Sequence, residues 1–185
     1  MKIFVIGQSG CGKTPFAENI ARLLPFAHIT SSAWVRSRFR SRAPDESRDS
    51  YIAAITEFSI EVLRNDPLAC VSYMQAHHDL TKNCVVEGVR NPLVFFQLFD
   101  PRQDIVVFLR YEHNPFQKTA FEEGVDVIAH YIDYAKKIGL IGADRSITYT
   151  FGRFFVKDPL PQNGSKGSLE GYIGDFSRRL SIALQ

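Results

Sequence analysis

Residues 7 to 14 read Gly-Gln-Ser-Gly-Cys-Gly-Lys-Thr and match the pattern G-x-x-x-x-G-K-[ST]. A β-rich run, Lys2 to Ile6, precedes this stretch, and apolar residues with helical spacing follow it from Lys13 to Leu24. This strand–loop–helix context is the one in which the pattern forms a phosphate-binding loop. The stretch therefore predicts an anion-binding loop at the end of the first strand.

The chemistry of this loop follows from its glycines and its final two residues. Gly10 and Gly12 let the backbone turn and approach a ligand without a Cβ clash. The N–H groups from about Ser9 to Thr14 can then point at phosphate oxygens, helped by the positive end of the following helix. We expect Lys13 to bridge the β- and γ-phosphates of ATP and the Thr14 hydroxyl to bind Mg²⁺. The predicted nucleotide-binding residues are Gly7, Ser9, Gly10, Cys11, Gly12, Lys13 and Thr14.

Cys11 has two interpretations. The N-terminus of a helix favours a thiolate, so Cys11 could be a reactive thiol. The interpretation that we favour is a small residue that the loop tolerates. Together with Cys70 and Cys84 it makes three scattered cysteines, too few for a disulfide framework or a zinc site. We therefore expect a reducing, cytoplasmic environment.

Further strands and helices alternate along the chain. Strong strand signals cover 84–89 and 104–110, weaker ones cover 27–30 and 146–151, and helical spacing fills most of the intervals. The expected helices include one over 33–42 and one over 114–138, the second either continuous or in two pieces around Gly124. This order predicts a single α/β domain over residues 1–185, with a three-layer α/β/α fold and a mostly parallel central sheet.

A second chemical signal lies at the end of the strand at 84–89, which reads Val85-Val86-Glu87-Gly88-Val89 and is followed by Arg90. Parallel strands that neighbour a phosphate loop deliver their carboxyl ends to the same crevice. Glu87 could then act in the Mg²⁺ shell or orient the attacking hydroxyl, and Arg90 could bind an acceptor phosphate. The competing interpretation is an ordinary strand end with a solvated Glu and Arg.

Arginines gather in the third region of interest, residues 34 to 42, which read WVRSRFRSR. A base could stack on Trp34 while Arg36 or Arg38 binds phosphate. Equally, the arginines could pair with the following acidic residues, Asp45, Glu46 and Asp49. A nucleic-acid patch is disfavoured because 22 Lys and Arg against 20 Asp and Glu leave a net charge of only +2.

Other features bound the function. No apolar run approaches the length of a membrane span, and the first residues lack the pattern of a signal peptide. The five histidines show no metal-ligand spacing. Glu122, Glu123 and Asp126 could extend a Mg²⁺ site, although a solvated helix face is the interpretation that we favour.

The order of these motifs resembles the nucleoside monophosphate kinase-like branch of the P-loop kinases across residues 1–110, a branch that includes adenylate kinases, deoxynucleoside monophosphate kinases and phosphomevalonate kinases. The resemblance implies that Glu87 lies near Mg²⁺ and that Arg90 contacts the acceptor phosphate. It also implies an acceptor-binding segment at 31–66, holding Arg36 and Arg38, with Arg40 a further candidate. The catalytic residues that it implies are Lys13, Glu87 and Arg90.

The resemblance further implies a closing lid at 111–142, and there the sequence departs from the family pattern. No arginine lies between Arg110 and Arg145, and the only basic residues other than histidine are Lys118, Lys136 and Lys137. Arg145 or Arg153 could replace the lid arginines, a second subunit of a homodimer could supply the charge, or catalysis could be weak or absent.

We therefore expect an ATP- and Mg²⁺-dependent small-molecule kinase whose acceptor bears a phosphate group, with a nucleoside or deoxynucleoside monophosphate first among the candidates. The alternative is a nucleotide-binding regulatory or switch protein with little kinase activity. The sequence has no N-K-x-D element of a typical GTPase.

Overall fold

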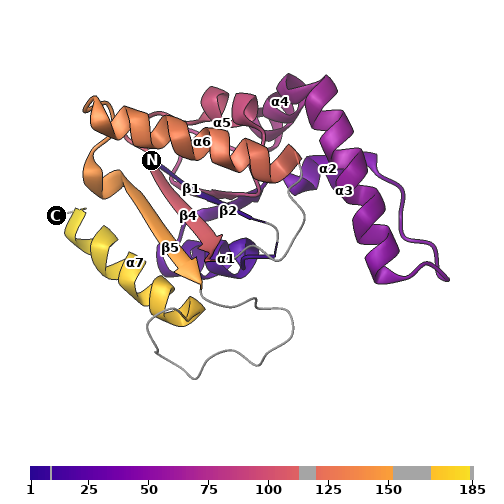
Figure 1. The fold of residues 1–185 in the computed structure, drawn as a ribbon, viewed down its shortest axis with the longest axis horizontal. Helices are drawn as coiled ribbons and strands as arrows, with labels where there is room; N and C mark the ends of the chain where they lie inside the picture. Colours follow the sequence, from indigo (N-terminus) through magenta and orange to yellow (C-terminus); the bar gives the residue numbers. More distant parts are fainter. Residues whose placement is uncertain (9, 113–119, 152–167, 184–185) are drawn as a thin grey trace.

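The computed structural model describes residues 1–8, 10–112, 120–151 and 168–183 (Figure 1). Five strands form one sheet in the order β2-β3-β1-β4-β5, and every neighbouring pair is parallel. The strands are β1 (Lys2–Gly7), β2 (Ala27–Thr30), β3 (Cys84–Glu87), β4 (Ile105–Tyr111) and β5 (Ser146–Phe151). The helices are α1 (Lys13–Leu23), α2 (Ser32–Arg38), α3 (Arg48–Asn65), α4 (Pro67–His77), α5 (Pro92–Leu98), α6 (Ala120–Lys137) and α7 (Leu169–Ala183), with a short 3₁₀ turn η1 (Ala143–Arg145).

Helices cover both faces of the sheet, because successive side chains of each buried strand point to opposite sides. Ile3 and Val5 of β1 pack in one cluster with residues of α1 and α7. Phe4 and Ile6 pack in the other cluster with residues of α2, α4, α5 and α6. Figure 1 shows α4, α5 and α6 on one side of the sheet and α1 and α7 on the other. The predicted three-layer α/β/α fold with a parallel sheet is confirmed.

Two helices differ from the sequence prediction. The helix expected over 33–42 ends at Arg38, because Phe39 is extended and packs on the rings of Tyr51 and Phe58, with centroids 5.6 and 5.1 Å away. Helix α6 runs through Gly124 without a break. The start of the helix expected from residue 114 lies outside the described residues.

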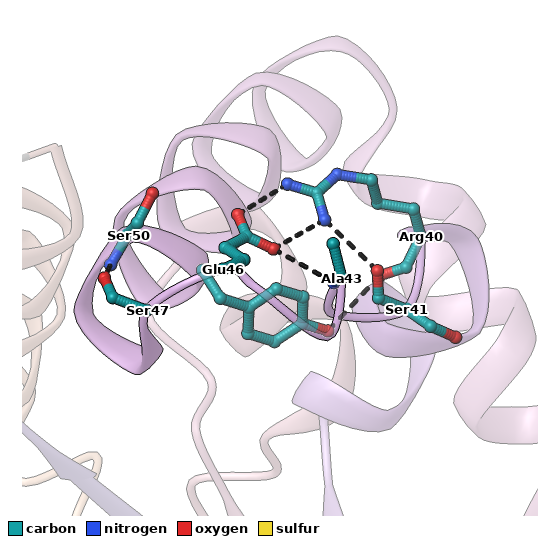
Figure 2. Close-up of polar contacts among 7 residues, drawn as sticks. Arg40, Ser41, Ala43, Glu46, Ser47 and Ser50 are labelled. Atoms are coloured by element: carbon teal, nitrogen blue, oxygen red, sulfur yellow. Dashed lines mark hydrogen bonds and ion pairs between the residues drawn. The ribbon is translucent and has the colours of Figure 1, made fainter.

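The connection between α2 and α3 is closed by an arginine of the basic stretch (Figure 2). The guanidinium of Arg40 donates to both carboxylate oxygens of Glu46, at 2.8 and 2.7 Å, and to the Ser41 carbonyl at 3.1 Å. The Ala43 N–H also donates to Glu46. For Arg40, the interpretation of pairing with a nearby acidic residue is therefore confirmed.

None of the helices in the described part of the chain has both the length and the apolar composition that crossing a bilayer requires.

Candidate active site

The phosphate loop leaves the end of β1 between its two neighbours in the sheet. Val5 pairs with Glu87 of β3, and Gly7 pairs with Leu109 of β4. A Cβ atom on Gly7 would lie 2.3 Å from the Leu109 carbonyl oxygen and 2.7 Å from the Cys11 sulfur. Only glycine fits at this position, so the loop can turn tightly against the sheet.

Two other glycines give the loop its curvature. Gly10 and Gly12 have φ angles of 71° and 77°, in the left-handed region that residues with a side chain rarely adopt. Helix α1 begins at the next residue, Lys13, so its free N–H groups face the loop. Ser9, the remaining predicted loop residue, lies outside the described residues.

The Lys13 side chain folds into the loop and is only 6% exposed. Its ammonium donates to the Gln8 carbonyl at 2.5 Å and lies 3.8 Å from the Cys11 sulfur. Burial and the nearby positive charge of Arg90 lower the pKa of Lys13 to about 8. Among the described residues, the Gln8 carbonyl is the one strong acceptor that this buried cation has, and phosphate oxygens would compensate its charge better.

Cys11 is a structural residue of the loop. Its side chain is fully buried, and that burial raises the pKa of the thiol. A reactive cysteine needs a lowered pKa and access to solvent. The interpretation of Cys11 as a small residue that the loop tolerates therefore fits the structure, and the reactive-thiol interpretation does not.

Two residues that hold the loop were not found from the sequence. The Tyr111 N–H donates to the side-chain oxygen of Gln8 at 2.9 Å, and the Tyr111 hydroxyl donates to the Gly10 carbonyl. Tyr111 is the last residue of β4, which pairs with β1. The sequence signal was available: an aromatic residue with a hydroxyl ends the strand that neighbours the loop.

Thr14 and Glu87 come together as predicted. The Thr14 hydroxyl donates to Glu87 Oε1 at 3.2 Å, and the Glu87 residue is buried. A hydroxyl and a carboxylate are the oxygen donors that Mg²⁺ prefers, so this pair fits the ion that the sequence led us to expect. Within the described residues, no three side chains of His, Cys, Asp or Glu gather into a metal site of their own.

Arg90 is enclosed by the start of α6. Its guanidinium carbon lies 4.8 Å from the centre of the Phe121 ring, and burial lowers its pKa. The nearby Glu122 carboxylate opposes that shift. Glu122 is only 4% exposed, so the expectation that it belongs to a solvated helix face is wrong, whereas Glu123 is exposed as expected.

Helix α6 also touches the backbone that carries Arg90. A Cβ atom on Gly124 would lie 2.0 Å from the Arg90 carbonyl oxygen. Three residues of the helix, Val125, Ile128 and Ile132, are part of the hydrophobic core. Helix α6, which belongs to the segment 111–142, is therefore packed against the core and the Arg90 backbone; the closing lid itself stays a prediction.

A cavity of about 410 Å³ joins these groups. Its lining includes Lys13 and Thr14 of α1, Glu87 at the end of β3, Arg36 of α2 and Arg90. The remaining lining includes Gly10, Ser31, Ser32, Ser59, Leu63 and Phe121. The cavity thus combines the phosphate-binding loop with two guanidinium groups from separate elements.

Arg38 does not line this cavity. Its guanidinium carbon lies 5.0 Å from the centre of the Trp34 ring. Trp34 itself is 1% exposed and lies in the core, so the interpretation in which a base stacks on it does not fit the structure. Of the three arginines at 36, 38 and 40, Arg36 alone contributes to the site.

No protein-family model matches the sequence, and no curated protein sequence matches it. Among solved structures, a gluconokinase from Sinorhizobium meliloti aligns with 98% of this chain and 92% of its own, at a TM-score of 0.51 and 16% identity. A shikimate kinase from Acinetobacter baumannii, solved with shikimate, aligns with 100% of this chain and 94% of its own, at a TM-score of 0.49 and 15% identity. The likeness to the gluconokinase, together with the all-parallel sheet, shows that the chain has the fold of the P-loop kinases.

Proposed function

We propose that the protein is an ATP-dependent small-molecule kinase that transfers the γ-phosphoryl group to an anionic acceptor. One observation carries this proposal: a single cavity is lined by the loop lysine, the Thr14–Glu87 pair and the two arginines Arg36 and Arg90. A protein that only binds nucleotide needs the loop, but it has no need of two further arginines, Arg36 and Arg90, in the lining of the same cavity.

The residues divide into two groups. The loop N–H groups and Lys13 would bind the phosphates of ATP, and Lys13 would leave the Gln8 carbonyl to do so. Thr14 and Glu87 would hold Mg²⁺, which supplies charge neutralisation at the phosphates when it is bound. Arg36 and Arg90 would orient the acceptor so that its reacting oxygen faces the loop.

The acceptor that we propose carries a phosphate group, with a nucleoside or deoxynucleoside monophosphate as the first candidate. Two guanidinium groups suit a doubly charged phosphate, which can take bidentate hydrogen bonds from each. Arg36 of α2 and Ser59 of α3 line the cavity, and this supports the acceptor-binding role that we propose for the segment 31–66. Small phosphorylated or carboxylated hydroxy compounds would meet the same two charges, so they belong in the test.

The test is a coupled assay of ADP release with ATP, Mg²⁺ and a panel of acceptors: the nucleoside and deoxynucleoside monophosphates, phosphorylated metabolites and hydroxy acids. We expect at least one acceptor to raise ADP release far above the rate without acceptor, and the Lys13→Ala variant to lose this increase. Release at the Lys13→Ala rate for the whole panel would contradict the proposed function.

The alternative, a regulatory or switch protein, predicts a different pattern. Calorimetry would then show tight binding of ATP or GTP without any turnover that depends on an acceptor. The cavity lining disfavours this alternative, because it places Arg36 of α2 and Arg90 in the same cavity as the phosphate loop.

A further inference from the structure

The outer surface of α5 and α6 carries most of the exposed apolar side chains. Among the described residues, nine large apolar side chains are exposed, and six of them lie on α5, α6 or the turn after α6. They are Leu93, Phe96, Val127, Tyr134, Ile138 and Leu140. Scattered single residues of this kind are normal on a monomer, whereas a contiguous patch marks an interaction surface.

The α6 part of this patch follows a heptad spacing. Val127, Tyr131, Tyr134 and Ile138 are separated by four, three and four residues, which places them in one stripe along the helix. Tyr131 is half-buried because its ring packs on Phe96 of α5, with 4.8 Å between centroids. In Figure 1, α6 lies in front of α5, and among the described elements none is drawn in front of α6.

An acid and a base, with a histidine midway between them, follow the open edge of the stripe at the same seven-residue spacing. Glu123, His130 and Lys137 are all exposed and form one row, with the acid near the start of α6 and the base near its end. On the opposite edge of the stripe, Ile128 and Ala135 are buried. A partner helix therefore meets charge along one edge only.

We propose that this face pairs with the same face of a second copy of the chain, with the two α6 helices antiparallel about a two-fold axis near His130. In this arrangement Glu123 of each copy faces Lys137 of the other, because the two residues are equally far from His130. A two-fold interface repeats each contact, so one complementary pair gives two ion pairs. A parallel pairing would instead set Glu123 near Glu123 and Lys137 near Lys137.

The packing along the stripe agrees with this register. Val127 of one copy lies opposite Tyr131 of the other, and Ile138 lies opposite the small Ala120. Helix α6 has 18 residues and is about 27 Å long. With Leu93 and Phe96 of α5 at its side, the patch has the aromatic and aliphatic composition of an interface core.

Sedimentation velocity of the full chain over a range of concentrations tests the pairing. We expect a reversible dimer, and we expect Ile138→Lys to yield monomer because it places charges in the seam. Leu23→Lys is the matched control, since Leu23 and Ile138 are both 58% exposed and Leu23 lies on α1; this variant keeps the dimer. Circular dichroism verifies that each variant is folded.

Charge reversal tests the antiparallel register. Glu123→Lys and Lys137→Glu each weaken dimerisation by roughly two- to thirtyfold, and the double variant restores it. A wild-type chain that stays monomeric at every concentration overturns the proposal. A dimer that Leu23→Lys disrupts as strongly as Ile138→Lys also overturns it, as does a double variant weaker than both single variants.

Discussion

The hydroxyl of Thr14, in the first turn of α1, donates a hydrogen bond to the carboxylate of Glu87 at the end of β3, with 3.2 Å between the two oxygens. The two residues are 73 positions apart in the sequence. They meet because β1 and β3 are parallel neighbours in register, so the loop after β1 and the last residue of β3 reach the same edge of the sheet.

This pair predicts how activity depends on magnesium. Thr14→Ala removes the hydroxyl and Glu87→Gln removes the negative charge from the proposed Mg²⁺ shell, so each lowers activity at limiting Mg²⁺ by about 10- to 100-fold. In both variants, the Mg²⁺ concentration that gives half-maximal activity is higher than in the wild type. Thr56→Ala is the control, because the Thr56 hydroxyl contacts only the Ile52 carbonyl of its own helix in the described structure. An unchanged Mg²⁺ requirement in both loop-edge variants would remove the pair from the metal site.

Lys13 predicts a pH dependence of stability without nucleotide. Its pKa is about 8 in the folded chain, against 10.5 as the ordinary value. Between these values the unfolded chain binds more protons than the folded chain, so the free energy of unfolding rises with pH from about 8 to about 10.5. Below pH 8 the cost of the buried charge is present in full.

Replacing the lysine removes this cost. We expect Lys13→Met to raise the free energy of unfolding at pH 7 by about 2 kcal/mol, the charge penalty less one lost hydrogen bond. The gain shrinks at about pH 10, where part of the wild-type penalty is already relieved. Urea unfolding at both pH values measures the difference, with the exposed Lys82→Met as the control. A variant less stable than wild type at both pH values refutes the prediction.

The arginine pair on α2 gives a matched test of the acceptor site. Arg36 and Arg38 are both exposed and lie two residues apart, yet only Arg36 lines the cavity. Arg36→Ala therefore raises the KM of the acceptor by roughly tenfold or more, the worth of a charged hydrogen bond, while the KM of ATP stays nearly constant. Arg38→Ala leaves both values close to wild type. Equal effects of the two variants would place acceptor recognition elsewhere.

What the sequence could predict depends on how local each signal is. The loop from Gly7 to Thr14 and the buried strands are encoded by contiguous residues, so the sequence pattern was sufficient to predict them. The pairing of Glu87 with Thr14 needed one further rule, that parallel strands deliver their carboxyl ends together. That rule holds in this sheet, and the pair was found.

Residues whose role depends on packing were not predictable in the same way. Glu122 has acidic Glu123 beside it and reads as part of a charged helix surface, yet the rotation of α6 turns it inward toward Arg90. Trp34 sits in a basic stretch and reads as a stacking platform, yet it fills the core. In both cases the neighbouring sequence is polar, and only the contacts of the helix in three dimensions decide which side is buried.

Gly124 shows how closely α6 packs against the site, and it supplies the last prediction. A methyl group there would lie 2.0 Å from the Arg90 carbonyl oxygen, which belongs to the backbone and has no flexible end to move away. Gly124→Ala must therefore separate α6 from the segment that carries Arg90. We expect the free energy of unfolding to fall by about 2 kcal/mol or more, as in overpacked cores.

Gly174→Ala is the matched control: Gly174 lies within α7, and its added Cβ would meet no atom within 4 Å. The free energy of unfolding of the Gly174→Ala variant rises by about 0.5 to 1 kcal/mol, because alanine has a higher helix propensity than glycine. Urea unfolding of the two variants measures the opposite signs, and a Gly124→Ala protein as stable as Gly174→Ala would mean that α6 does not contact the Arg90 backbone in solution.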